Sequence, residues 1–338
     1  MDPVRVGVLG VGKMGERHCR VYSNLRDATF VGLADLDEPR AREIASNYGT
    51  EYFANHKDLL REVDAVTIAT TTRAHFSLAM DALNANVDIL VEKPLTQTVE
   101  QGEELVAAAI SQDRIAQMGH IERFNPAYVE LKNVIENFAE AGMQLIGLNF
   151  RRLSPFDTSN VDVDVVKDLM IHDLDLVSDL CGRSLADIRA WGRSTTTDSV
   201  DQAWANLSFQ GGPVAQLIAS RITEQKVRSV EVTVDGAYIE ADLLGKTLTI
   251  HRRTLPKYDK AKYQQESIIE RIHVPMDEPL LLEQRHFVEC VQHRRPNRVP
   301  ATDGLYALKL AQEIANQIGD GSARSTAESF SRRLTANE

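Results

Sequence analysis

The feature that most constrains the fold is a glycine-rich turn close to the start of the chain. An apolar run over residues 4–9 leads into the spacing G-x-G-x-x-G, and a helical pattern follows. In such a strand–turn–helix unit the glycines allow a tight turn, a close approach of the backbone to a pyrophosphate, and close helix packing. The helix N-terminus then offers N–H groups and its positive dipole end to the phosphates. The pattern predicts a dinucleotide site formed by Gly10, Gly12, Lys13, Met14 and Gly15.

The first part of the chain alternates short apolar runs with helical segments, which is typical of βαβ units and a parallel sheet. The candidate strands are residues 4–9, 29–34, 65–70, 88–92 and 114–118. Helix starts are marked by Asp37 with Pro39, and by Thr98 with Gln101 as a capping box. We predict a doubly wound Rossmann domain over residues 1–122.

The pattern changes at Asn125 and Pro126, which suit the N-cap and first position of a long helix. The strands that follow are longer and alternate apolar with polar residues. They are residues 145–151, 188–196, 202–209, 214–221, 229–234, 237–243, 246–251 and 267–274, and helical patterns close the chain at 281–292 and 305–318. We predict a second α/β domain over residues 123–330, with an open and mostly antiparallel sheet. Alternation at Val230, Val232 and Val234 suggests a sheet face that a second copy covers, in a homodimer or homotetramer.

Composition limits the classes of partner. The chain has 338 residues, enough for two domains, with 43% hydrophobic and 26% charged residues, as in a folded globular protein. With 38 basic and 49 acidic residues the net charge is -11, and no basic block is long enough to follow a phosphate backbone, so nucleic acid and anionic membranes are poor partners. Three separated cysteines and the lack of a basic and apolar leader before the first strand favour the cytoplasm.

An acidic residue in the Rossmann pattern bears on the cofactor. Asp35 ends the second strand, 20 residues after Gly15. A carboxylate there can bind the adenosine ribose hydroxyls and repel a 2'-phosphate. NAD is therefore favoured over NADP, although Arg40 and Arg42 lie close enough in the sequence to reduce the discrimination.

Three further residues can move a proton. Asp168 and His172 are four apart in a helical pattern, so both project from one face, and Lys93 follows a buried strand at the carboxyl edge of the sheet. An imidazole can take the proton of an alcohol while a hydride leaves carbon, a carboxylate can orient it, and an ammonium can stabilise the developing alkoxide. For each residue alone, a solvated surface position is the alternative.

A metal site is another alternative, because acidic residues gather around His172; they are Asp162, Asp164, Asp168, Asp173 and Asp175. We predict no metal, because Asp162 and Asp164 precede the helix and the others fit its first turn and exposed face.

Together these residues resemble the glucose–fructose oxidoreductase, inositol dehydrogenase and rhizopine catabolism (Gfo/Idh/MocA) family over almost the whole chain. The resemblance implies a Rossmann domain, a second domain whose open sheet supports dimers or tetramers, and a lysine of an E-K-P motif acting with a D-x-x-x-H pair. Glu92-Lys93-Pro94 and Asp168 with His172 match these motifs, and Glu92 and Lys93 are also expected to contact the cofactor. The segment from Thr70 to His75 resembles the family's T-P-x-x-x-H loop beside the cofactor, with Thr71 in place of the proline.

Residues 117–126 and 168–173 resemble the branch of the family that oxidises UDP-N-acetylglucosamine at C3. This implies a UDP-sugar as the substrate, with a free sugar or inositol as the alternative. A dinucleotide-sensing protein without catalysis is the alternative from another class, but sensing does not require the proton-transfer residues. Candidate substrate contacts near the domain boundary are Arg123, Asn125, Arg151 and Arg152, for which interdomain or surface ion pairs are the alternative.

Overall fold

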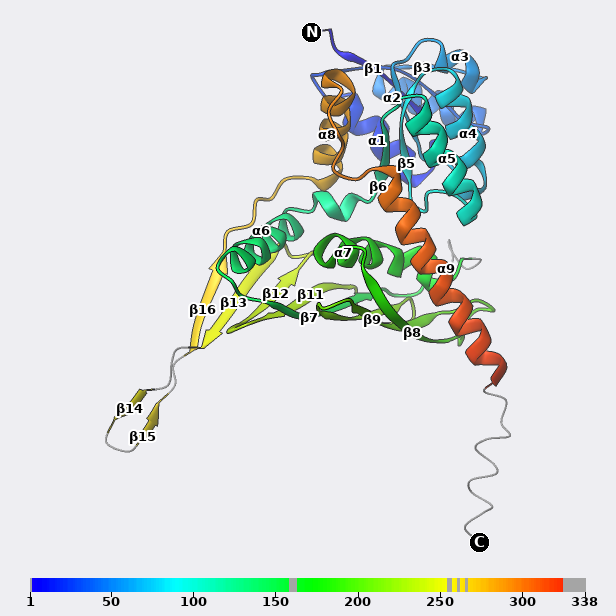
Figure 1. Ribbon diagram of the computed structural model, residues 1–338. Coiled ribbons are helices and arrows are strands. Elements are labelled where there is room, and N and C mark those ends of the chain that lie inside the picture. The colour runs from blue at the N-terminus through cyan, green and yellow to red at the C-terminus, as the bar shows by residue number, and fades with distance from the viewer. Residues whose placement is uncertain (1, 158–162, 254–256, 260–261, 265–266, 325–338) are drawn as a thin grey trace. The chain divides into compact units, whose positions relative to one another are not determined.

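The computed structural model describes residues 2–157, 163–253, 257–259, 262–264 and 267–324. It divides the chain into two compact units (Figure 1). The first contains the residues up to Pro126 together with Met276–Leu308, and the second contains Ala127–Pro275 together with the residues from Lys309 onward. No helix in the described part of the chain combines the length and the apolar character needed to cross a membrane.

A parallel sheet with the strand order β3-β2-β1-β4-β5-β6 forms the centre of the first unit, as a doubly wound fold requires. Its strands are β1 (Val4–Leu9), β2 (Ala28–Ala34), β3 (Glu51–Tyr52), β4 (Ala65–Ile68), β5 (Asp88–Glu92) and β6 (Ala116–Gly119). All residues of β4 and β5 are buried, since helices cover both faces of the sheet. The prediction of this sheet is confirmed, but β3 was missed because two residues leave no periodic signal.

The helices of the first unit form two layers. One face of the sheet packs against α1 (Lys13–Tyr22), α2 (Glu38–Tyr48) and α8 (Pro279–His293). The other packs against α3 (His56–Leu60), α4 (Thr72–Asn84) and α5 (Val99–Ser111). The predicted N-caps are confirmed, because the Arg40 N–H donates to the Asp37 carboxylate and the Gln101 N–H donates to Thr98 Oγ1. The capping box is not completed, because the buried Gln101 Oε1 has no hydrogen-bond partner among the described residues. A short 3-10 helix, η1 (Ile121–Phe124), follows β6.

The division of the chain differs from the predicted boundary by four residues, 123–126, which belong to the first unit, and at one later segment. Residues 276–308 were assigned to the second domain, but they group with the first unit. This grouping follows from the burial of apolar side chains, because Phe287, Val288 and Val291 of α8 belong to the same buried cluster as the β1 valines. A periodic pattern shows that a helix buries one face, but it does not identify the sheet that this face covers.

The second unit contains an eight-stranded sheet with the order β16-β13-β12-β11-β7-β10-β9-β8. Its strand pairs are antiparallel except β7 with β10, so the predicted sheet type is confirmed. The strands are β7 (Leu145–Leu153), β8 (Leu185–Arg193), β9 (Gln202–Phe209), β10 (Val214–Ser220), β11 (Val227–Val234), β12 (Ala237–Asp242), β13 (Thr247–Arg253) and β16 (Ser267–Ile272), with β14 (Lys257–Asp259) and β15 (Lys262–Gln264) as a separate pair. The helices are α6 (Pro126–Glu140), the π-helical turn η3 (Val166–Met170), α7 (Ile171–Cys181) and the later part of α9 (Ala301–Arg324).

The two faces of this sheet differ. Val230, Val232 and Val234 are buried, and they share a face with Arg152, which pairs with Asp173 on α7. These valines are thus covered within the chain, so the predicted reason for self-association was wrong. The opposite face carries the cross-strand neighbours Trp191, Trp204 and Ile218, and Trp191 is 52% exposed.

Candidate functional site

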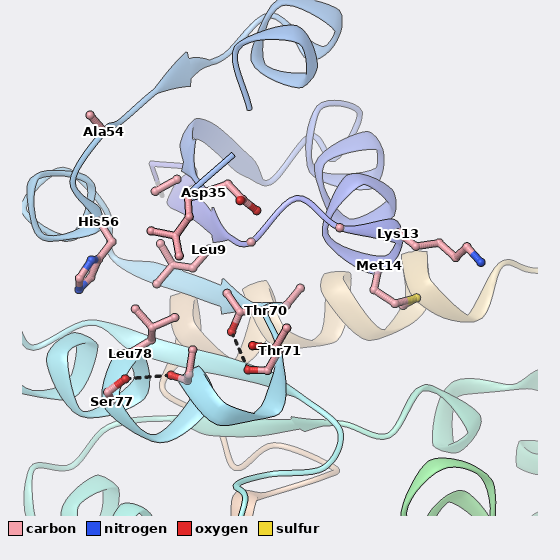
Figure 2. A pocket seen from close by; sticks show the side chains of 16 residues that line it. Leu9, Lys13, Met14, Asp35, Ala54, His56, Thr70, Thr71, Ser77 and Leu78 are labelled. Atoms are coloured by element: carbon pink, nitrogen blue, oxygen red, sulfur yellow. Dashed lines mark hydrogen bonds between the residues drawn. The ribbon is translucent and has the colours of Figure 1, made fainter. Parts of the chain in front are cut away.

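The β1–α1 turn borders a cavity of about 610 Å³ at the carboxyl ends of the parallel strands (Figure 2). Open α/β sheets bind their ligands at this edge. The cavity is lined by the glycine turn, the end of β2 and the β4–α4 connection; the residues are Leu9, Gly10, Gly12, Lys13, Met14, Ala34, Asp35, Leu36, Ala54, His56, Ala69, Thr70, Thr71, Ala74, Ser77 and Leu78. Most of the predicted cofactor contacts therefore lie together in one place.

The local geometry explains why glycine occupies each of the three positions in the turn. Gly10 has a φ of +88°, and a Cβ there would lie 2.8 Å from the Ala69 carbonyl oxygen. A Cβ on Gly15 would lie 1.8 Å from the Gly10 carbonyl oxygen, so only glycine lets α1 begin this close to the turn. Gly12 is the N-cap of α1 and would meet no atom within 4 Å, which leaves room for a ligand to approach the uncapped helix start. The glycine turn and the uncapped start of α1 together fit a dinucleotide pyrophosphate.

Asp35 connects the end of β2 to the glycine turn. Its carboxylate accepts hydrogen bonds from the Val11 N–H at 2.6 Å and the Asp37 N–H at 2.9 Å. The carboxylate is thus held at the cavity wall, where an adenosine ribose would meet it. The next residue, Leu36, is fully exposed although it lines the cavity, and an exposed apolar side chain at such a site suits a flat aromatic base. Leu36 was not predicted as a site residue, although its position directly after the acidic residue was a usable signal.

The two arginines near Asp35 are both engaged elsewhere. Arg40 donates to the Val11 carbonyl oxygen at 2.8 Å and pairs with Glu16 at 3.0 Å. Arg42 pairs with Glu38 at 2.8 Å, and its guanidinium lies 4.8 Å from the centre of the Tyr52 ring. Neither lines the cavity. Both guanidinium groups therefore have partners outside the cavity.

His56 is a second residue that the sequence analysis missed. It begins α3 and lines the cavity, and its Nε2 lies 2.9 Å from Asp81 on α4. This pair joins the two helices beside the site. Its two members are 25 positions apart in the sequence, so no local pattern indicated it.

His75 and Glu92 do not line the cavity, in contrast to Thr70. His75 is buried, with Nδ1 2.9 Å from the Pro94 carbonyl oxygen and Nε2 3.2 Å from that of Thr70. Burial lowers the pKa of His75, and its two ring nitrogens face the carbonyl oxygens of Pro94 and Thr70. His75 therefore ties the residue after Lys93 to the cavity wall at Thr70.

The predicted proton-transfer residues lie on well-defined elements. Lys93 directly follows β5, at the carboxyl edge of the first sheet. Asp168 lies in the π-helical turn η3, and His172 lies one position into α7 after Ile171. Single π-turns inside helices occur frequently at functional sites, and this one was not predicted. Lys93 belongs to the first unit and the Asp168–His172 pair to the second, so their joint action is a proposal.

The four predicted substrate contacts have diverse surroundings. Arg123 is buried and pairs with Asp303 at 3.0 Å, and the buried Asn125 side chain donates to Glu122 at 3.0 Å. Arg152 is 3% exposed and pairs with Asp173 at 2.6 Å. Arg151 lies on the sheet face away from Arg152 and α7. Because His172 is on α7, this position does not support a contact between Arg151 and a substrate bound at His172 of the same chain.

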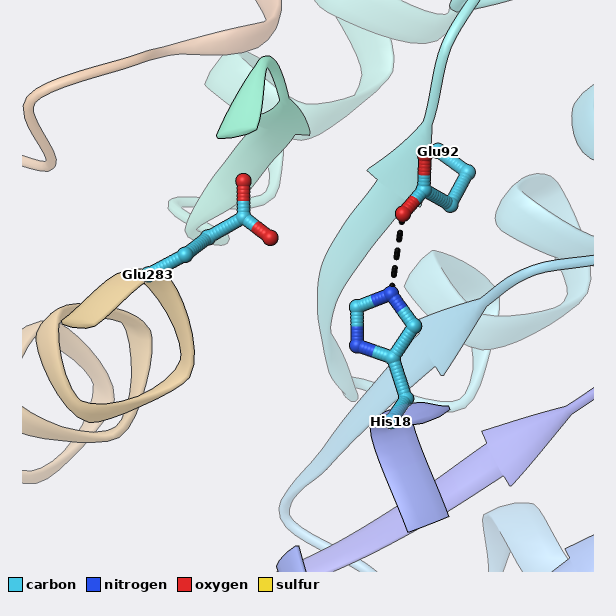
Figure 3. Close-up of side chains that lie close together, drawn as sticks. All are labelled: His18, Glu92 and Glu283. Atoms are coloured by element: carbon cyan, nitrogen blue, oxygen red, sulfur yellow. Dashed lines mark hydrogen bonds and ion pairs between the residues drawn. The ribbon is translucent and has the colours of Figure 1, made fainter. Parts of the chain in front are cut away.

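Two of the acidic residues around His172 serve the helix and the core. Asp164 accepts from the Lys167 N–H at 2.9 Å as a cap, and Asp173 pairs with Arg152; Asp162 lies outside the described residues. Within the described ranges, a set of three close metal-ligand atoms forms in the first unit instead, from His18, Glu92 and Glu283 (Figure 3).

Comparisons with known proteins agree with this geometry. The family model "Oxidoreductase family, NAD-binding Rossmann fold" matches residues 4–120, and the "GFO/IDH/MocA C-terminal domain" model matches residues 152–240. The chain belongs to the Gfo/Idh/MocA oxidoreductase family. It is therefore an oxidoreductase with a dinucleotide-binding Rossmann domain, as members named dehydrogenases are.

Relatives in the Gfo/Idh/MocA family cover nearly the whole chain. UDP-N-acetylglucosamine 3-dehydrogenase of Acidithiobacillus ferrooxidans is 33% identical over 93% of this chain and 97% of its own length. A solved structure of that enzyme has a TM-score of 0.84 at 32% identity, and covers 94% of this chain and 98% of its own. The NAD-dependent scyllo-inositol 2-dehydrogenase of Bacillus subtilis is 26% identical over 94% of this chain and 95% of its own length.

Proposed function

We propose that this protein oxidises the C3 hydroxyl of a UDP-linked amino sugar such as UDP-N-acetylglucosamine to a ketone, with NAD as the cofactor. One observation carries the proposal: a chain 33% identical to an enzyme of that name has Lys93 directly after β5, and has Asp168 and His172 four positions apart in the consecutive elements η3 and α7. A dinucleotide-sensing role would require the glycine turn but none of these three residues.

The proposed chemistry uses three side chains. His172 takes the hydroxyl proton as the general base, and Asp168 orients the imidazole and stabilises its cation. Lys93 donates a hydrogen bond to the hydroxyl oxygen and stabilises the negative charge that develops there. NAD, when bound, accepts the hydride that leaves C3. The products are the 3-keto sugar and NADH, and the hydroxyl proton is left on His172.

The proposed cofactor contacts follow the cavity. Gly10, Gly12 and the N-terminus of α1, with Lys13 and Met14, would hold the pyrophosphate. Asp35 would bind the ribose hydroxyls, and Leu36 would contact the adenine. The engagement of Arg40 and Arg42 with other groups supports NAD over NADP.

The proposed substrate is tested by a panel of UDP-N-acetylglucosamine, UDP-glucose, N-acetylglucosamine, scyllo-inositol and myo-inositol. Reduction of NAD would be followed by absorbance with each compound. We expect turnover of UDP-N-acetylglucosamine and little with the sugars that lack UDP. Preferential turnover of an inositol would support the second candidate, which the scyllo-inositol relative favours.

The proposed assembly is a homodimer or homotetramer in the cytoplasm. The open face of the second sheet supports it, since Trp191, Trp204 and Ile218 form an apolar stripe across neighbouring strands. Exposed stripes of this kind commonly mark protein interfaces.

A further inference from the structure

A buried polar cluster lies next to Lys93 and is not explained by cofactor or substrate binding. His18 of α1, Glu92 of β5 and Glu283 of α8 each contribute a polar atom, and these atoms lie within 4.8 Å of one another. The exposed fractions are 0% for His18 and Glu283 and 8% for Glu92. Figure 3 shows the Glu283 carboxyl group directed toward the other two side chains. Three elements that are distant in the sequence therefore meet at the residue before Lys93.

The hydrogen bonds assign the proton of His18. Gln284 Nε2 lies 2.7 Å from His18 Nδ1 and 3.2 Å from the His18 carbonyl oxygen. Because a carbonyl oxygen can only accept, the amide nitrogen must face it, and Nδ1 must then accept as well. The ring proton is therefore on Nε2, which donates to Glu92 Oε1 at 2.9 Å. This bond fixes Glu92 from the side of α1.

Glu283 is in a different state from Glu92. Both Glu283 carboxyl oxygens are buried and have no hydrogen-bond partner among the described residues. Burial, and then the nearby Glu92 carboxylate, raise the pKa of Glu283 well above its ordinary value. Burial raises the pKa of Glu92 too, but the hydrogen bond from His18 and the charge of Lys93 oppose this rise. The cluster thus holds one carboxylate, Glu92, beside a neutral carboxyl group.

A metal ion is the obvious alternative for one imidazole and two carboxyl groups. A metal-binding imidazole usually donates its other ring N–H to a carboxylate, a carbonyl or a water. Here the other ring nitrogen, Nδ1, faces an amide donor, so Nε2 carries the proton and cannot bind a cation. The tautomer therefore favours a hydrogen-bonded cluster over a metal centre.

We propose that Glu92 is a positioning residue for Lys93, that His18 holds its carboxylate in place from α1, and that the neutral Glu283 side chain of α8 encloses it. Gly119 on β6 completes the enclosure, since a Cβ there would lie 3.2 Å from the Glu92 carboxyl carbon. The proposal rests on the proposed function only in that Lys93 touches the reacting hydroxyl.

The cluster also connects two parts of the proposed site. The first residues of α1, Lys13 and Met14, line the cofactor cavity, and His18 lies on the next turn of the same helix. The bond from His18 to Glu92 thus fixes the end of β5, and with it Lys93, relative to the helix that would hold the pyrophosphate.

The test compares four variants of the full chain with NAD and UDP-N-acetylglucosamine. Glu92→Gln removes the charge, Glu283→Gln replaces one neutral group by another, and Lys93→Met removes the proposed catalytic ammonium. Asp88→Asn is the matched control, because Asp88 is a buried carboxylate at the other end of β5 that pairs with Arg294 at 2.7 Å. Single-turnover NADH formation is measured with enzyme in excess, together with NAD affinity and Tm.

For Glu92→Gln we expect the single-turnover rate constant to fall by about 10- to 100-fold, as for a small displacement of a catalytic group, at unchanged NAD affinity. Glu283→Gln should stay within about threefold of the wild type, and Asp88→Asn should lower Tm at an unchanged rate constant. A merely structural role for Glu92 would lower the Tm and the amplitude of single-turnover NADH formation but not its rate constant, and that result would overturn the proposal.

The remaining outcomes are also decisive. If Lys93→Met is inactive while Glu92→Gln matches the wild type, the positioning proposal fails and the proposed function stands. If Lys93→Met keeps the wild-type rate constant, the proposed function fails, whatever the result for Glu92→Gln. An equal loss for Glu283→Gln and Glu92→Gln would show that Glu283 is not a neutral group. Mass spectrometry measures bound metal. If the wild type holds stoichiometric metal and the Glu92→Gln and Glu283→Gln variants do not, the cluster is a metal centre and the proposal is wrong.

Discussion

The Val11 N–H donates to Asp35 Oδ2 at 2.6 Å, so the carboxylate at the end of β2 is part of the glycine turn. We predict that Asp35→Asn keeps an acceptor for this N–H but loses the charge that repels a 2'-phosphate. The ratio of the NADP and NAD dissociation constants should fall by about tenfold or more, which is ~1.4 kcal/mol. Titration of cofactor fluorescence or calorimetry measures both constants.

Asp37→Asn is the control for this change. Asp37 is a carboxylate two positions away that caps α2 and does not line the cavity, so its loss should leave the ratio unchanged. Equal affinity of the wild type for the two cofactors would contradict the role given to Asp35.

The buried pair of Arg152 and Asp173 allows a structural role to be separated from substrate binding. Removing one partner of such a pair typically costs about 3–5 kcal/mol, because the other charge stays buried and unpaired. We therefore predict that Arg152→Met lowers the Tm of the protein markedly, and that Arg152→Met with Asp173→Leu regains much of the loss. If Arg152 mainly binds substrate, the single variant would instead raise KM at an unchanged Tm.

Much of the first unit could be predicted from the sequence because its signals are local. The strands β1 and β5 begin and end where the apolar runs do, and the caps at Asp37 and Thr98 are set by residues three positions apart. The return of α8 to the first sheet could not be predicted, because it depends on contacts between Phe287 and β1 residues far away in the sequence.

The candidate site, too, could be predicted only where its residues belong to local sequence motifs. The glycine turn and Asp35 belong to short motifs, and the structure places them around one cavity. His56, by contrast, reaches that cavity only through the fold. Glu283 and His18 are separated by more of the chain, and nothing in either local pattern indicates that they meet beside Glu92.

Glu283 should make stability depend on pH. Because the pKa of its buried carboxyl group is raised, the folded protein keeps a proton that the unfolded chain loses above about pH 4.3. The unfolded chain then binds fewer protons, so the free energy of unfolding falls as pH rises from that value toward the folded pKa. Glu283→Gln cannot ionise, so the wild-type Tm should fall relative to the Tm of this variant as the pH rises above about 4.3. A Tm difference that is constant over this rise in pH would contradict the neutral state of Glu283.

Self-association should depend on the open face of the second sheet. We predict that Trp191→Glu together with Trp204→Glu converts the oligomer to a smaller species, because both side chains lie on neighbouring strands of that face. Light scattering at micromolar concentration measures the mass. A monomeric wild type, or a variant of unchanged mass, would remove this face as the interface.

The central claim is that His172 is the general base, and the most direct measurement is the turnover of UDP-N-acetylglucosamine with NAD by His172→Ala. Loss of a positioned base typically costs about 10²- to 10⁴-fold in rate, so kcat should fall into this range while NAD affinity stays near that of the wild type. Asp168→Asn should show a similar or smaller loss, because it keeps one hydrogen bond. If His172→Ala turns over the substrate at a near-normal rate, the assignment is wrong and another group takes the proton.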